Sequence, residues 1–493
     1  MNLGDSVRKG VKWLVFGNTG GQILQFAFGI VLARLLVPAD FGMIVTIQIF
    51  TGFVAMFATG GMGQSLIRAK EATDEDFDAV FTLQLVVGII VYCGFFVCAP
   101  WVASYLENPL YKDLLRVSAL SFILRPFSFV RIAWLTRAMN FRKRATVDLT
   151  AGVLAGVFSV VMAAAGWGVW SLTLTGLFGA LIASVFYFFA TPLRIRLRID
   201  RVIARRHAGY GFKITANDFL DYLRDEGVNL MLSKMAGPAF LGLFNKASSL
   251  SRMPNRLLMP STGQSVFRAL SKVQDDLDTT KYIFYRTITL LTVYVLPFLV
   301  GLWWVAEPFI RVVYGPKWLP AAEPMMILVV GAAFRTINNP CGVLLAAQNR
   351  LVQEMVGQTL GLILTVIACL VGLNFGMKGV AWAIVASNIF YATYNYALAY
   401  RTIRTGPTDL LKAIAPALLL NVPLFAILAG VHHLTGDLKS STPSVYLGAM
   451  TITGLLAYAC AFLFLPIPAL RTEAARWRDA ARRGAGWVSK ALL

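Results

Sequence analysis

One stretch of the sequence concentrates charge where a membrane protein normally avoids it. Residues 211–237 read GFKITANDFLDYLRDEGVNLMLSKMAG, which is long enough to cross a bilayer, since a spanning helix needs about 20 mostly apolar residues. The stretch carries seven charged residues, Lys213, Asp218, Asp221, Arg224, Asp225, Glu226 and Lys234. Charge inside a membrane is costly unless it is paired or faces water. The stretch is therefore either a soluble insert or a helix that keeps its charge in a cavity.

A helix over this stretch would have a single polar stripe. Lys213, Asn217, Asp221 and Arg224 lie within about 80° of one another in helical projection, and Asp218 and Asp225 flank them. The stripe predicts a hydrophilic, partly cationic cavity wall. Alternatively, ion pairs across a helical turn, such as Asp221 with Arg224, form a staple that holds two parts of the protein together.

Cations in neighbouring apolar runs extend this candidate substrate site. They are Arg125, Lys246, Arg252 and Arg335. Arg131 and Arg286 are further intramembrane cations. An excess of Arg and Lys over acids within the membrane suits an anionic substrate such as a diphosphate. The acids Asp218, Asp221 and Asp225 are candidates for ion coupling, by changing protonation or by binding sodium.

The composition predicts an all-α polytopic membrane protein without a soluble domain. The chain has 493 residues, of which 57% are hydrophobic and 14% charged, whereas soluble domains carry about 25% charged residues. Apolar runs of spanning length recur along the whole chain and predict fourteen transmembrane helices. Their approximate ranges are 12–36, 42–67, 79–103, 114–136, 147–166, 169–191, 211–235, 239–267, 281–305, 321–347, 352–373, 379–400, 412–433 and 445–466.

The distribution of basic residues tests this count. The net charge is +20, and Arg and Lys concentrate in alternate loops, as the positive-inside rule requires if both termini are cytosolic. Adding or dropping one span would reverse the alternation from that point. This explanation of the basic charge leaves nucleic acid as an unlikely partner. The tail, 469–493, predicts a basic helix on the inner membrane surface, and a site for a partner protein is an alternative.

Two short sequence matches indicate an internal repeat. LARLLVPADFG at 32–42 matches LSKMAGPAFLG at 232–242, and GWGVWSL at 166–172 resembles GMKGVAWA at 376–383. Each pair marks a tight outside hairpin, so the repeat unit has six spans and both units enter the membrane from the same side. The predicted domains are two six-helix lobes, 1–205 and 206–405, an extra two-helix hairpin, 406–468, and the tail, 469–493. Two such lobes can rock about a site between them and expose it to each side in turn.

No residue pattern indicates a cofactor, a metal site or catalysis. The five cysteines lie in apolar runs without metal-ligand spacing, and His432 and His433 are expected in a short solvated loop. A membrane polymerase or ligase would need catalytic groups in a sizeable outside loop, and no loop offers a plausible acid–base pair. No Walker-type nucleotide loop is present. We therefore expect a non-enzyme driven by an ion gradient, the membrane potential or consumption of its product.

Several motifs carry a resemblance to a known family. Four parts of the sequence resemble the polysaccharide transporter family of lipid-linked oligosaccharide flippases. They are VLARLLVPADFG, the segment from Gly211 through STGQSVFRALSKVQDD, MNFRKRATVDL with GWGVWSL, and VVYGPKWLPAAEPMMIL. This family belongs to the multidrug/oligosaccharidyl-lipid/polysaccharide exporter superfamily. The resemblance covers roughly residues 10–405.

The resemblance implies a flippase of the bacterial cytoplasmic membrane. It would move undecaprenyl-diphosphate-linked repeat units from the inner to the outer leaflet, for exopolysaccharide, capsule or O-antigen assembly. Spans one and seven would line a cationic cavity, with Arg34, Lys213, Arg224 and Lys234 as candidates. The middle of span one, FGNTGGQILQFAFG, holds no cation, so the cationic site would depend on the second lobe. The implied partners are the glycolipid, membrane lipids, and a polysaccharide polymerase with chain-length proteins. The alternative is a cation-coupled multidrug-type antiporter, which would favour an acidic, aromatic-lined pocket.

Overall fold

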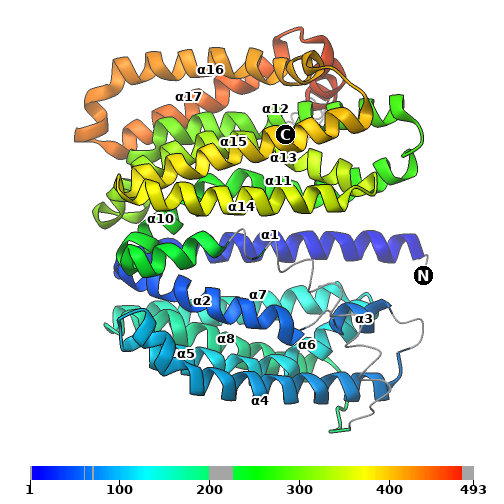
Figure 1. Ribbon diagram of the computed structural model, residues 1–493, viewed down its shortest axis with the longest axis vertical. Helices are drawn as coiled ribbons and strands as arrows, with labels where there is room; N and C mark the ends of the chain where they lie inside the picture. Colours follow the sequence, from blue (N-terminus) through cyan, green and yellow to red (C-terminus); the bar gives the residue numbers. More distant parts are fainter. Residues whose placement is uncertain (1–2, 60–61, 69–71, 199–221, 223–225, 480–493) are drawn as a thin grey trace, which may run out of the picture. The chain divides into compact units, whose positions relative to one another are not determined.

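The computed structural model describes residues 3–59, 62–68, 72–198, 222 and 226–479, and every long regular element in them is a helix (Figure 1). The predicted all-α fold class is confirmed. The α-helices are α1 Leu3–Leu35, α2 Pro38–Thr59, α3 Met62–Arg68, α4 Asp74–Tyr105, α5 Leu110–Ala119, α6 Ser121–Arg137, α7 Phe141–Ala164, α8 Val169–Ala190, α10 Gly237–Ser251, α11 Met253–Lys272, α12 Leu277–Phe309, α13 Ala322–Ala347, α14 Leu351–Leu373, α15 Gly376–Ile403, α16 Pro407–Ser441 and α17 Pro443–Phe464.

Ten helical segments in the described part of the chain are long and apolar enough to cross a membrane. They correspond to ten of the fourteen predicted spans, with α5 and α6 together forming one of them. The remaining four predicted spans are α1, residues 211–235, most of which lie outside the described residues, α10 with α11, and α15. The chain is thus polytopic, while the count of fourteen and the cytosolic termini remain predictions.

The described chain divides into two compact units, residues 1–245 and 246–493. In the first unit, α1 packs closely on α7, because glycines let the two backbones approach. A β-carbon at Gly17 would lie 2.8 Å from Cβ of Ala145, and Gly156 of α7 faces the ring of Phe28. Figure 1 shows α7 running beside α1. This close contact positions the polar side chains of α1 next to those of α7.

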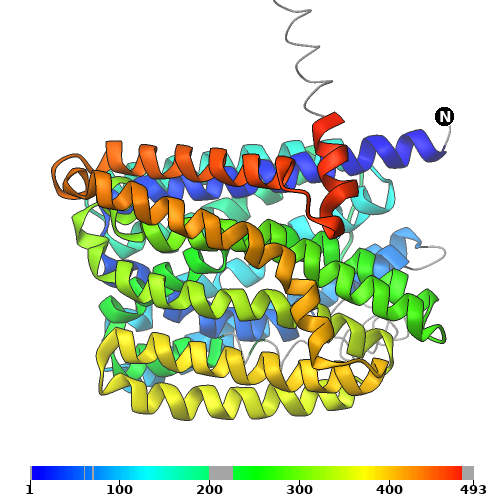
Figure 2. The ribbon, with the colours of Figure 1, turned by 90° about the horizontal axis from the view of Figure 1, so that it is seen from above.

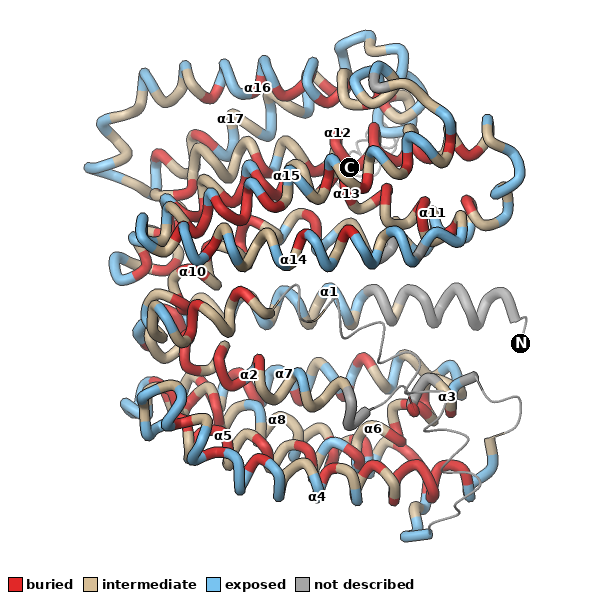
Figure 3. The backbone as a smooth tube through the Cα atoms, viewed as in Figure 1, coloured by how far each residue is buried: buried red, intermediate tan, exposed pale blue. Residues whose placement is uncertain are grey.

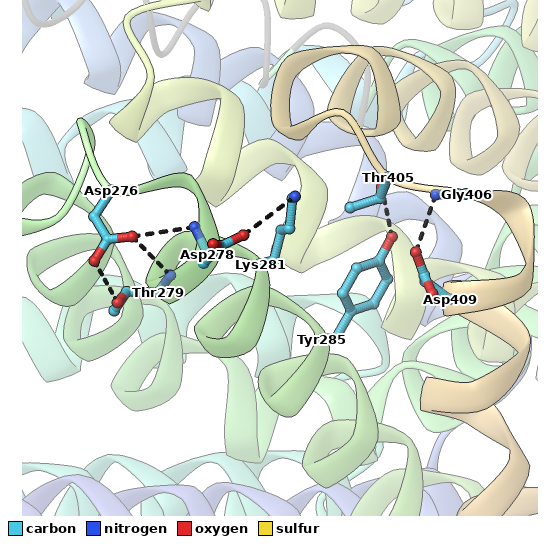
Figure 4. Close-up of polar contacts among 8 residues, drawn as sticks. All are labelled: Asp276, Asp278, Thr279, Lys281, Tyr285, Thr405, Gly406 and Asp409. Atoms are coloured by element: carbon cyan, nitrogen blue, oxygen red, sulfur yellow. Dashed lines mark hydrogen bonds and ion pairs between the residues drawn. The ribbon is translucent and has the colours of Figure 1, made fainter.

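In the second unit, α12 is packed by α13, α16 and α17. Val293 of α12 is buried in one cluster with Ala417, Leu420 and Phe462. At the start of α12, the Asp276 carboxylate caps the helix by accepting hydrogen bonds from the amides of Asp278 and Thr279, each at 3.1 Å. About two helical turns further, the Tyr285 hydroxyl donates to Thr405 Oγ1 at 2.8 Å, which fixes the junction of α15 and α16 against α12 (Figure 4).

An exposed apolar stripe on α14 shows which surface lipid must cover. Val352, Val356, Leu360, Ile363, Ile367 and Val371 are between 45% and 74% exposed and recur every three or four residues. Figure 3 shows this exposed face along α14. Water would solvate such a stripe poorly, whereas acyl chains solvate it well, so this face of the second unit faces the membrane.

The structure corrects one sequence interpretation. His432 and His433 lie inside α16, which continues to Ser441, and not in a loop. His432 Nδ1 lies 2.9 Å from the Tyr446 hydroxyl, whose side chain is fully buried. The polar segment HHLTGDLKSS therefore continues α16 beyond its apolar part. Val431 and Leu438 on one side of this part of α16 pack against the cluster that contains Leu428 and Tyr446.

Candidate functional site

A polar pocket of about 320 Å³ lies between α1 and α7 in the first unit. From α1 it is lined by the glycines and amides of the GNTGGQ segment and by Gln25, and from α7 by Phe141, Arg144, Ala145 and Asp148. Residues without large side chains, Gly17 and Gly21, leave the space, and the amides of Asn18 and Gln22 supply donors and acceptors. Such a surface suits a ligand rich in hydroxyl groups.

The pocket also contains a charged cluster. Arg144 Nε lies 3.7 Å from Asp148 Oδ2, one turn along α7. Tyr187 of α8, which is fully buried, donates its hydroxyl to Asp148 Oδ1 at 2.6 Å. Arg144 Nη1 also donates to Thr136 Oγ1 at 3.1 Å. The guanidinium is thereby fixed in position, with further N–H donors for an anionic ligand.

Sequence reasoning missed Arg144 because it treated MNFRKR as a cytosolic loop, and it assigned no role to Asp148 in the predicted span 147–166. The helix begins earlier than predicted, at Phe141, where the Asn140 side chain accepts a hydrogen bond from the Lys143 amide at 3.3 Å. Arg144 and Asp148 therefore lie in the first two turns, on one face. The signal that could have found them is the asparagine N-cap followed by an i, i+4 Arg–Asp pair. Arg144 also gives α1 a neighbouring cation from within the first unit.

All six residues of the predicted stripe and its flanks lie outside the described residues. They are Lys213, Asn217, Asp218, Asp221, Arg224 and Asp225. Their roles in substrate binding and ion coupling remain predictions. Of the remaining candidates, Arg34, Arg125 and Lys234 lie in the first unit, and Lys246, Arg252 and Arg335 in the second. None of these six lines the pocket between α1 and α7.

The six described candidates lie in several different environments. Arg34 is exposed in the last turn of α1. Arg125 is exposed on α6, with its guanidinium carbon 5.2 Å from the Phe122 ring centre. Lys246 lies over two aromatic rings of its own unit, with Nζ 4.8 Å from the Tyr314 centroid and 5.1 Å from that of Trp318. Arg252, between α10 and α11, and Arg335, in α13, are half-buried.

Lys234 forms an ion pair on the side predicted to face outside. Its Nζ lies 2.6 Å from Glu107 Oε1, in the turn between α4 and α5, and 5.1 Å from the Tyr105 ring centre. The hydrogen bond and the charge of Lys234 hold the pKa of Glu107 below its ordinary value of 4.5. Lys234 is thus engaged by a protein carboxylate in this conformation.

This pair has a pH dependence with a defined sign. Because the folded-state pKa of Glu107 is lowered, the pair stabilises the fold above the ordinary pKa of glutamate, and the stabilisation disappears as pH falls through the lowered value. We expect Glu107→Gln to lower the melting temperature slightly at pH 7, and the difference to shrink and vanish as the pH falls through the lowered pKa of Glu107. Thermal unfolding of both proteins across this range measures the effect. A difference that persists at low pH would contradict the pairing.

The two repeated segments lie against each other in the first unit. A β-carbon at Gly42 would overlap the Pro238 carbonyl oxygen, and one at Gly242 would overlap the Pro38 carbonyl oxygen. The contact is reciprocal, since both glycine–proline pairs are related by the 200-residue offset of the repeat. The backbones of α2 and α10 thus touch at two positions, 42 and 242, where only glycine fits.

We call the contact of Gly42 with Pro238 and of Gly242 with Pro38 the glycine crossing. Hydrogen bonds lie beside it. Thr46 Oγ1 of α2 and Ser233 Oγ are 2.6 Å apart, and both side chains are buried. The Tyr111 hydroxyl of α5 donates to Thr46 Oγ1 at 3.5 Å. Three segments that are far apart in sequence are thereby tied at one point. Together with the pair of Lys234 and Glu107, these contacts link segments of the first unit on the side predicted to be outside.

Comparisons with known proteins agree with this architecture. The profile of a family described as polysaccharide biosynthesis proteins matches residues 31–323, more than half of the chain. The chain is 26% identical to the lipopolysaccharide biosynthesis protein WzxC of Escherichia coli (strain K12) over 359 residues, which is 71% of this chain and 72% of that protein. It is also 26% identical to the succinoglycan biosynthesis transport protein ExoT of Rhizobium meliloti (strain 1021) over 339 residues, 68% of this chain and 67% of that protein.

Solved structures share the fold. The lipid II flippase MurJ in an inward closed conformation has a TM-score of 0.70, at 15% identity over 95% of this chain and 99% of that chain. An inward-facing multidrug resistance transporter of the MATE family, from the MOP superfamily, has a TM-score of 0.64, at 14% identity over 78% and 94%. The ten apolar helices and the bacterial relatives indicate a multi-pass protein of a bacterial inner membrane. With more than half of its length matching the family profile, the chain belongs to the polysaccharide biosynthesis protein family.

Proposed function

We propose that the protein is a flippase that moves undecaprenyl-diphosphate-linked oligosaccharide repeat units from the inner to the outer leaflet. The observation that carries this proposal is the pocket between α1 and α7. It combines amide side chains, which suit sugar hydroxyls, with a positioned guanidinium at Arg144, which suits a phosphate or an acidic sugar. The relatives that are named for polysaccharide synthesis and transport support the same substrate class.

Movement would occur by alternating access. In this mechanism the glycine crossing and its hydrogen bonds would close the side predicted to be outside. For the substrate to leave on that side, the contacts of Gly42 with Pro238 and of Thr46 with Ser233 must break. Separation would lose the short-range backbone contact at the glycines and the hydrogen bonds at Thr46, each worth about 1 kcal/mol.

The predicted stripe on 211–237 completes the proposed site. Lys213 and Arg224 would contribute the remaining cations, and Asp218, Asp221 and Asp225 would carry a coupling ion. A cation-coupled multidrug antiporter is the second candidate, and Asp148 favours it, since a carboxylate beside the amides of α1 could bind a cationic drug or a proton. The two candidates differ in the charge of the transported molecule.

The proposed function is tested in proteoliposomes. We expect the purified protein to transfer a fluorescent undecaprenyl-diphosphate oligosaccharide between leaflets, and Lys213→Ala and Arg224→Ala to slow the transfer at matched protein levels. A cationic dye under an imposed proton or sodium gradient is the comparison substrate. Gradient-driven dye transport without glycolipid transfer would overturn the flippase and support the antiporter.

A further inference from the structure

The second unit contains a long apolar groove that ends at the C-terminal helix. Its volume is about 640 Å³, and it runs between α12, α16 and α17. Phe298, Gly301 and Val305 line it from α12, and Met450 and Gly454 from α17. A groove of this composition between membrane-spanning helices suits a hydrocarbon chain better than water, because water would gain almost no hydrogen bonds there.

A short basic helix closes one end of this groove. Residues 471–479 are helical, and Figure 2 shows them running across the direction of α17. Trp477 lines the groove and donates its indole N–H to the Tyr294 hydroxyl at 3.1 Å. An indole at the end of an apolar slot, with its polar edge hydrogen-bonded, is the arrangement found at membrane interfaces.

A partly buried ion pair fixes this helix to α12. Arg286 donates to the carbonyl of Ala469 and lies 3.2 Å from Glu473 Oε1, with the Glu473 side chain only 16% exposed. Leu470 is buried in the cluster around Val293. The single acid of the helix face toward α12 is thereby neutralised, and the helix is held in one orientation.

The helix also carries three exposed arginines, and two of them, Arg471 and Arg478, share one face because they are seven residues apart. Arg471, Arg476 and Arg478 are all exposed, and the Arg476 side chain is 75% exposed although it reaches Glu473 at 3.1 Å. Exposed arginines on a helix whose Trp477 lines an apolar groove provide two of the signals that recruit an anionic lipid, cations for the headgroup and a site for one chain.

We propose that this place is a binding site for an anionic phospholipid of the surrounding bilayer, such as phosphatidylglycerol. The phosphate would bind at Arg471 and Arg478, and an acyl chain would lie in the groove past Trp477. The bound lipid would join the C-terminal helix to α12 and α17. This site differs in position and ligand from the pocket between α1 and α7.

The test uses the purified full-length protein in neutral detergent. We expect phosphatidylglycerol to raise the melting temperature by about 2–4 °C and phosphatidylcholine to have little effect. The triple variant Arg471→Gln/Arg476→Gln/Arg478→Gln should lose the phosphatidylglycerol shift. The corresponding triple lysine variant should keep most of it. The matched control removes three exposed cations elsewhere in the same unit, Arg268→Gln/Arg401→Gln/Lys412→Gln, and should retain the full shift.

A second variant tests the groove without touching the charges. A β-carbon at Gly301 meets nothing within 4 Å, so Gly301→Leu should fold and fill the slot, and should also lose the phosphatidylglycerol shift. Equal shifts in all variants, or equal loss in the triple variant and its control, would overturn the site. Stabilisation by undecaprenyl phosphate and not by phosphatidylglycerol would overturn the proposed ligand.

Discussion

Oxidising a cysteine pair at positions 46 and 233 is expected to stop glycolipid transfer, and reduction is expected to restore it. The Oγ atoms of Thr46 and Ser233 are only 2.6 Å apart, and a disulfide requires about 2.0 Å between sulfur atoms. The variant Thr46→Cys/Ser233→Cys should therefore cross-link with little backbone movement. If transfer requires the glycine crossing to separate, the cross-linked protein cannot complete the cycle.

The experiment requires a background without the five native cysteines. Of these, Cys341 and Cys369 are buried in the second unit, so conservative replacement by alanine or serine must be checked for stability. The single variants Thr46→Cys and Ser233→Cys, treated with the same oxidant, are the controls and should transfer normally. Full transfer by a protein shown to be cross-linked would mean that the crossing stays closed throughout transport.

Arg144→Gln is expected to reduce transfer of a diphosphate-linked oligosaccharide by about 10- to 100-fold. A hydrogen bond to a charged group contributes about 1.5–3 kcal/mol, and each 1.4 kcal/mol corresponds to a factor of ten. Arg144 is the cation of the pocket, and Asp148 and Thr136 already fix its orientation. The loss should therefore appear in transfer without a comparable loss of stability. Initial rates in proteoliposomes, at matched protein levels, measure this effect.

Two matched variants separate charge from position. Arg142→Gln removes an exposed cation two residues away that does not line the pocket, and should leave transfer nearly unchanged. Tyr187→Phe keeps the ring but removes the hydrogen bond to Asp148 Oδ1, which frees the carboxylate to pair more closely with Arg144, so transfer should fall by a smaller factor. Equal activity of Arg144→Gln and Arg142→Gln would remove the pocket from the substrate path.

The sequence was a good guide where hydrophobic patterning decides the structure. Long apolar runs dominate the composition, and ten of the predicted spans are present as apolar helices. A predicted span can fail to reach the hydropathy of a membrane helix because it carries polar side chains, and α1 is an example. α1 contains Asn18, Gln22 and Gln25, and these residues line a polar pocket. A helix that faces a pocket loses the hydropathy by which spans are recognised.

The site was harder to predict because it depends on where helices begin and which faces meet. Arg144 belongs to a run of basic residues that is typical of a cytosolic loop, and only the start of α7 at Phe141 turns it into a pocket residue. The repeat of Gly42 and Gly242 was visible in the sequence. Its reciprocal contact with Pro238 and Pro38 was not, because a linear pattern does not show which helices approach each other. Glu107 has no sequence feature that links it to Lys234.

The most direct test of the central claim compares two lipid carriers of the same oligosaccharide. One is undecaprenyl diphosphate, and the other is an uncharged polyprenyl lipid of equal length. If a cationic pocket selects the substrate, proteoliposomes should transfer the diphosphate-linked oligosaccharide much faster than the uncharged form, and Arg144→Gln should remove the difference. Equal transfer of both lipids by the unaltered protein would contradict recognition of charge, and with it the proposed role of the pocket between α1 and α7.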